Sequence, residues 1–146
     1  MIRAVVNTNI LIRALIKPQG TVGPVLTHLR DGDYVLLYVD PLLDELIAKL
    51  TLPRIRNKYH LSDEDVEIVL ALILLRGEPV TPQRRITACR DPKDNIVLEV
   101  AVDGGADFIV TGDNDLLVLH PFEGIPIIGP AEFLRALEYG GQSGCA

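Results

Sequence analysis

The chain has 146 residues, a net charge of −6, 48% hydrophobic residues and 23% charged residues. This length suits one domain, and the composition excludes a disordered or membrane-spanning chain. No apolar run is long enough to cross a bilayer, and the first residues lead directly into a predicted strand, so we expect a cytoplasmic protein. Cys89 and Cys145 are too distant in sequence to suggest a disulfide framework. An isoelectric point near 5.0 argues against nonspecific coating of nucleic acid, although a bound cation can reverse the local charge of an acidic site.

Short β-branched runs alternate with amphipathic segments along the chain. The pattern predicts strands at residues 2–6, 34–39, 108–110 and 125–128, with a short strand near Val80. It predicts helices at residues 10–16, 22–30, 40–50, 95–102, 116–119 and 130–137, and a long helix between Ser62 and Arg76. Alternating strands and helices predict an α/β fold with a mostly parallel sheet covered on both faces. We expect one domain at residues 1–137 and a disordered Gly/Ser-rich tail at residues 138–146.

Polar side chains follow four of the predicted strand-to-helix junctions. The carboxyl ends of parallel strands lie at one edge of a sheet, where ligands of open α/β proteins usually bind. The sequence therefore predicts that one edge collects these side chains: Asn7 and Asn9, Asp40 and Glu45, Asp94, and Asp113 and Asp115.

Several carboxylates gathered at one edge need a cation or raised pKa values. Two carboxylates about 4 Å apart repel by roughly 4 kcal/mol at an effective dielectric near 20. All-oxygen ligands favour Mg²⁺ or Mn²⁺ over zinc. Such ions activate water and stabilise charge on a phosphoryl group, which is the chemistry of nucleases and some phosphatases.

Each acid also has an ordinary structural explanation. Asp40 and Asp91 have the sequence context of helix N-caps, and for both we favour capping over catalysis. Asp94 could complete a capping box with Asp91, and Asp113 could cap the helix that follows it. Glu45 could simply favour the positive end of its helix. Only the convergence of several of these acids at one edge of the sheet therefore indicates a functional site.

Other catalytic patterns are weak or absent. The three histidines have no metal-ligand or triad spacing, and no G-x-S-x-G, Walker A or G-x-G-x-x-G sequence is present. Two groups of basic residues could contact phosphates, although solvated helix faces or partner contacts explain the first group equally well. These groups are Arg54, Arg56 and Lys58, and then Arg84, Arg85, Arg90 and Lys93 just before Asp94.

The predicted helix after Ser62 is apolar nearly all round between Ile68 and Leu75. Such a helix is either deeply buried or half used in a partner interface. We predict a homodimer that forms through this surface or through the first two helices.

Four segments together resemble the PIN-domain family, and their order and spacing extend to about Leu137. The segments are Val5–Leu11, Asp44–Leu46, Cys89–Asn95 and Ala106–Leu117. The group that the chain resembles most is the toxin component of bacterial and archaeal toxin–antitoxin pairs. The resemblance implies a Rossmann-like three-layer α/β/α fold, RNA cleavage that depends on Mg²⁺ or Mn²⁺, and a cognate antitoxin.

The resemblance also implies roles for individual residues. Metal ligands would be Glu45, Asp94 and Asp113, with Asp115 as a neighbouring or additional ligand, and these four acids would form the catalytic set. Supporting positions would be Thr8, Asn9 and Thr111, where the threonines orient water or a ligand.

The sequence departs from the family pattern at Asn7, where the first aspartate is usual, and at Asn95, where a second acid often follows Asp94. An amide oxygen can ligate a hard cation, but it brings no negative charge and cannot act as a base. Asn7 is therefore a weak metal ligand at best.

The leading hypothesis is a metal-dependent endoribonuclease, the toxin of a toxin–antitoxin pair, that hydrolyses single-stranded or looped RNA with a metal-activated water. The alternative is a noncatalytic PIN-like module that binds RNA or a protein partner. A phosphatase of the acidic Rossmann-like type is a third reading, but it would need a nucleophilic aspartate in place of Asn7.

Overall fold

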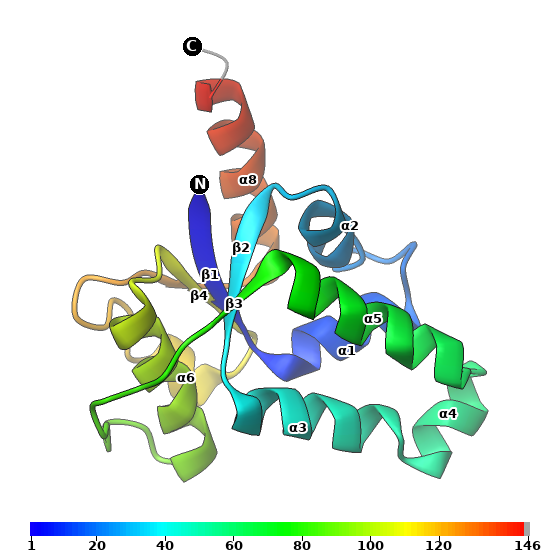
Figure 1. Cartoon of the computed structure of the whole chain (residues 1–146). Coiled ribbons are helices and arrows are strands. Elements are labelled where there is room, and N and C mark those ends of the chain that lie inside the picture. The colour runs from blue at the N-terminus through cyan, green and yellow to red at the C-terminus, as the bar shows by residue number, and fades with distance from the viewer. Residues whose placement is uncertain (145–146) are drawn as a thin grey trace.

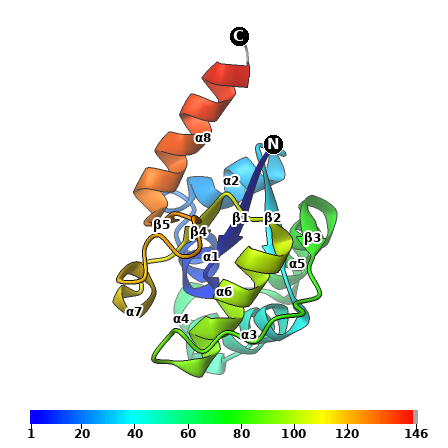
Figure 2. The ribbon, with the colours of Figure 1, turned by 90° about the vertical axis from the view of Figure 1, so that its left-hand side faces the viewer.

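The computed structural model describes residues 1–144, with side chains described through Tyr139. Its centre is a five-stranded sheet in the order β3-β2-β1-β4-β5, and all four strand pairs are parallel. Figure 1 labels β1 to β4, and Figure 2 also labels β5. The strands are β1 (Ile2–Val6), β2 (Tyr34–Tyr38), β3 (Gly77–Pro79), β4 (Phe108–Val110) and β5 (Ile127–Ile128). The predicted α/β class and parallel sheet are confirmed.

Helices cover both faces of this sheet, as the alternating pattern predicted. They are α1 (Thr8–Ile16), α2 (Pro24–Arg30), α3 (Asp40–Leu50), α4 (Pro53–Tyr59), α5 (Asp63–Arg76), α6 (Pro92–Gly104), α7 (Asn114–Leu117) and α8 (Pro130–Gly144). The start of α5 is fixed by a capping box, in which Ser62 and Asp65 bond each other's backbone N–H groups.

Successive side chains along each strand point to opposite faces of the sheet, and this alternation divides the core into two layers. Ala4 and Val6 of β1 point into a cluster formed with α1, α2, α5 and α8. Val5 points the other way, into a cluster formed mainly with α6. Figure 2 shows α6 lying over the near face of the sheet. The three-layer arrangement leaves the carboxyl ends of the strands free to form a site.

Two local predictions differ from the structure, and one segment without a predicted element forms a helix. The basic segment after Leu52 forms α4, which begins with Pro53 and is anchored where Arg56 Nε donates to the carbonyl of Leu50 at 3.3 Å. The short strand predicted at Val80 lies at Gly77–Pro79 instead, because Val80 only donates its N–H to Tyr38 where the pairing ends. Val39, rather than Asp40, occupies the N-cap position of α3, so the capping role predicted for Asp40 is wrong.

Helix α8 continues beyond Leu137, where the sequence analysis placed the end of the domain. It runs to Gly144 and stands out from the body of the molecule (Figure 2). Residues 138–144 of the expected tail therefore belong to a helix, and residues 145–146 lie outside the described residues. Among the residues that are described, none of the helices combines the length and hydrophobicity needed to traverse a bilayer.

Phe133 anchors α8 to the sheet. Its ring is fully buried and packs edge-on against Tyr34, with ring centroids 4.9 Å apart. We predict that Phe133→Ala lowers the free energy of unfolding by about 3–5 kcal/mol, because a large cavity replaces the ring. Urea unfolding measures the loss. Tyr139→Ala on the same helix is the control, since that side chain is 69% exposed. Equal, small effects of both substitutions would contradict this packing.

Candidate metal centre

The ends of β1 and β4 are tied together where the chain leaves the sheet. Asn7 donates its backbone N–H to the carbonyl of Val110 at 2.9 Å. The hydroxyl of Thr111 accepts from Asn7 Nδ2 at 3.1 Å and from the N–H of Asp113 at 3.0 Å. Thr111 is fully buried, so this polar link is shielded from water. It fixes the loop that carries Asp113.

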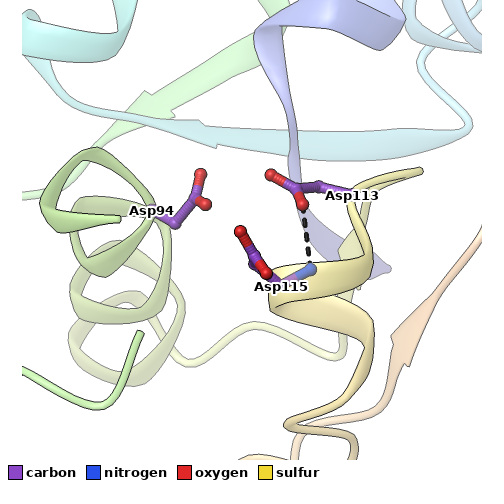
Figure 3. Close-up of side chains that lie close together, drawn as sticks. All are labelled: Asp94, Asp113 and Asp115. Carbon is purple, nitrogen blue, oxygen red and sulfur yellow. Dashed lines mark hydrogen bonds between the residues drawn. The ribbon is translucent and has the colours of Figure 1, made fainter. Parts of the chain in front are cut away.

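Three carboxylates meet beside this link. Asp94 is the third residue of α6, Asp113 is the N-cap of α7, and Asp115 lies in the first turn of α7. Each offers an oxygen, and these oxygens all lie within 4.8 Å of one another (Figure 3). Asp113 Oδ1 also accepts the N–H of Asp115 at 2.9 Å. Asp113 therefore caps its helix, as the simpler interpretation held, and also belongs to the acidic group.

The arrangement of the carboxylates affects the pKa of Asp94. Burial raises its pKa to about 6, and the negative charges of Asp113 and Asp91 contribute in the same direction. The capping box predicted between Asp91 and Asp94 is wrong. Asp91 does cap α6, by accepting the N–H of Lys93 at 3.0 Å, but Asp94 turns toward the other carboxylates.

The donor set fits a hard divalent cation. The three grouped residues supply only carboxylate oxygens, which Mg²⁺ and Mn²⁺ prefer, and a cation would remove the repulsion that raises the pKa of Asp94. Cys89 lies close by, with Sγ 3.7 Å from Asp94 Oδ2. Burial raises the pKa of its thiol, which disfavours the thiolate form.

A cleft of about 250 Å³ opens beside Asp94 and Asp113, whereas Asp115 is not among its lining residues. Its lining includes Asn7, Asn9, Glu45, Lys49, Asp91, Lys93, Asp94 and Asp113. Glu45 lies in this cleft but outside the group of three carboxylates, because it is paired with Lys49 at 2.8 Å. Lys49 also donates to Asn9 Oδ1 at 3.0 Å. The role of Glu45 as a metal ligand stays a prediction.

Both the oxygen and the nitrogen of the Asn7 side-chain amide form hydrogen bonds. Its oxygen accepts the N–H of Asn9 at 3.3 Å as the N-cap of α1, and its Nδ2 bonds to Thr111. The side chain therefore lies at the cleft as predicted, but it lends no negative charge there.

Two other polar residues near the site are buried. Thr8 lines a small pocket with Leu42 and Leu46, and Leu42 also lines the acidic cleft, so the supporting role of Thr8 stays a prediction. Asn95 is also buried, and its Oδ1 accepts the N–H of Cys89 at 2.7 Å. An unpaired carboxylate at position 95 would be costly in this buried position of the present structure.

The predicted basic residues are spread over two regions. Lys93 lines the cleft, and Arg90 is exposed just before α6. Arg54 and Lys58 are exposed on α4, outside the cleft lining. Arg56 pairs with Asp63 at the start of α5, so its main contacts are structural.

The sequence analysis overlooked Lys49 and assigned Asp91 only a capping role. Both line the cleft. Lys49 could have been found from its spacing, since a lysine four residues after a glutamate on one helix faces it. The position of Asp91 in the cleft depends on the approach of α6 to α7, for which the local sequence carries no signal.

This fold and site define a Rossmann-like α/β domain with an acidic group, able to hold a cation through oxygen ligands alone, at the carboxyl edge of its sheet. The PIN domain family matches residues 3–115, and the chain belongs to that family. It is also 32% identical over 120 residues to "Uncharacterized protein MJ1680" of Methanocaldococcus jannaschii, an alignment that covers 82% of this chain and 76% of that protein. Family membership indicates a nuclease-type domain that uses a divalent metal ion.

The raised pKa of Asp94 predicts a pH-dependent stability. The folded state binds the proton more tightly than the unfolded state, so the stabilisation is present below pH 4 and is lost as the pH rises through about 6. In EDTA at about pH 7.5, Asp94→Asn should raise the free energy of unfolding by about 1 kcal/mol, allowing for solvent screening. At about pH 4 this gain should vanish.

Chemical denaturation at the two pH values measures this difference. Glu138→Gln on α8 is the matched control, because it also removes one negative charge from an exposed position. A gain from Asp94→Asn that is the same at both pH values would contradict the repulsion.

Proposed function

We propose that the protein is a metal-dependent endoribonuclease. The observation that carries the proposal is the group of three carboxylates at the carboxyl edge of a PIN domain. Asp94, Asp113 and Asp115 would hold Mg²⁺ or Mn²⁺, with Glu45 as a further ligand and Asn7 as a weak one. When bound, such an ion activates water and stabilises charge on a phosphoryl group.

The chain's own residues prepare this cleft for a phosphodiester. Thr111 fixes the Asp113 loop through two hydrogen bonds, so the carboxylates keep their separation without a substrate. Lys93 on the cleft wall offers a positive charge to an approaching phosphate. Glu45 is neutralised by Lys49, which lowers the repulsion that an acidic cleft exerts on RNA.

The biological setting that we propose is that of a toxin with a cognate antitoxin in the cytoplasm, acting on single-stranded or looped RNA. The support is the resemblance of the four sequence segments, together with an open cleft that a bent backbone could enter. Inspection of the adjacent reading frame would test for an antitoxin.

A noncatalytic RNA-binding module is the second candidate. It is favoured by Asn7, whose amide is committed to Asn9 and Thr111 and leaves the cleft one negative charge short. Binding of RNA that persists in EDTA, without cleavage in any divalent ion, would support it.

The decisive experiment measures cleavage of a structured RNA with Mn²⁺, Mg²⁺ or EDTA. We expect wild type to cleave with metal only, Asp94→Asn to lose activity by at least about 100-fold, and Asn7→Asp to gain activity through tighter metal binding. Thermal shift in the same ions should show stabilisation of wild type and its loss in Asp94→Asn.

Each other outcome has a distinct meaning. Cleavage by Asn7→Asp alone would identify a nuclease scaffold that Asn7 disarms. Equal cleavage by wild type and Asp94→Asn would reject the acidic group as the active site. Metal-dependent stabilisation without cleavage by either variant would favour the binding module.

We also propose a homodimer that forms through α5. Ile68, Leu74 and Leu75 are 58%, 60% and 74% exposed on its outer side. Sedimentation at micromolar concentration should give the mass of two chains, and Ile68→Glu with Leu75→Glu should give one, because buried charge opposes association. Val118→Glu, at a 77% exposed position on another surface, should leave the dimer intact. A single-chain mass for wild type would reject this interface.

A further inference from the structure

One side of α1 carries polar residues outward from the acidic cleft. Asn9 and Arg13 are spaced four residues apart on one face of the helix, at a step of about 6 Å, and Lys17 follows as the C-cap residue where the helix ends. Asn9 lies in the cleft, where it accepts from Lys49. Arg13 and Lys17 are exposed, and among the described residues neither has a carboxylate partner.

Helix α4 meets the far end of this row. Arg13, Lys17 and Tyr59 line a common hollow of about 360 Å³, together with Ile16 and the turn at residues 20–22. Within the described part of the chain, no acidic side chain lines this hollow. Lys58 Nζ lies 5.4 Å from the centre of the Tyr59 ring, which adds a further positive charge.

Two of the three acids at the start of α5 have partners, whereas Glu64 is exposed and makes no side-chain hydrogen bond or ion pair among the described residues. Asp63 pairs with Arg56, and Asp65 accepts from Ser62 as part of the capping box. A chain with a net charge of −6 thus places unpaired cations and a half-buried tyrosine along one path that begins at its acidic cleft. Cations beside an aromatic ring are the combination that binds single-stranded nucleic acid, through phosphate contacts and base stacking.

We propose that Arg13, Lys17, Lys58 and Tyr59, here named the α1/α4 track, bind the single-stranded RNA that extends from the cleft. This inference rests on the proposed function, since it assigns the path of that RNA. The cations contact successive phosphates, and a base stacks against the Tyr59 ring. The track thereby supplies affinity that an acidic cleft lacks, and it favours unpaired strands because only they can present a base to the ring.

The test measures binding without cleavage. Fluorescence anisotropy follows a labelled oligouridine of about twelve nucleotides in EDTA, over a series of salt concentrations. Arg13→Gln with Lys17→Gln should weaken binding about tenfold at low salt and reduce the slope of log K against log salt by about 1.4, since each single-strand phosphate contact contributes about 0.7. Arg76→Gln with Arg135→Gln is the matched control, because it removes two exposed charges elsewhere and should leave both values within about twofold.

The tyrosine is tested separately. Tyr59→Leu should weaken oligouridine binding about tenfold, while Tyr59→Phe should retain it, because the ring rather than the hydroxyl stacks. Binding of an RNA duplex of the same length should not change with Tyr59→Leu, since its bases are already stacked.

Several results would overturn the track. One is that wild type does not bind RNA, and another is that the two double variants lose RNA binding equally. A third is that Arg13→Gln with Lys17→Gln leaves RNA binding unchanged but weakens binding of a polyglutamate peptide, which would make the surface a protein-docking site. Failure of the proposed nuclease is distinguishable, because the track then still binds RNA while no metal ion produces cleavage.

Discussion

The close grouping of three carboxylates is the constraint around which this site is built, and repulsion from Asp113 adds to the burial that raises the pKa of Asp94. Asp94, Asp113 and Asp115 come from two helices that start at the same edge of the sheet, and their oxygens lie within 4.8 Å of one another. The repulsion is sustained because each helix is fixed by packing that does not involve the acids. Leu98 of α6 and Leu116 of α7 are fully buried in the same core layer. The stability of that layer holds the charges in position.

The fold was predictable where local pattern and global arrangement agree. β-branched runs separated by amphipathic segments leave few topologies, so the parallel sheet and most helices followed from the sequence. The errors lie where tertiary contacts decide. Helix α4 has no side-chain N-cap, and its anchoring contacts with Leu50 and Asp63 come from neighbouring elements. Strand β3 has three residues and is defined by its pairing with β2.

The sequence predicted which strand-to-helix junctions form the site, but it did not predict how their side chains are arranged. Strand ends predicted that Asn7, Asp94 and Asp113 converge, and all three line one cleft. The positions of the strand ends do not predict which of these side chains form ion pairs. Glu45 has the position expected of a ligand, yet Lys49 holds it in an ion pair. The turn of Asp94 away from its own helix cap likewise depends on the approach of α7, which no local pattern encodes.

The buried hydroxyl of Thr111 makes residue 7 an adjustable position. With Asn7 the hydroxyl acts as an acceptor for the amide Nδ2. A carboxylate at residue 7 could instead accept the hydroxyl proton after a simple rotation, because a threonine O–H can either donate or accept. One side-chain replacement could thus change the charge of the cleft without repacking the core. The scaffold therefore separates the tuning of metal affinity from the maintenance of the fold.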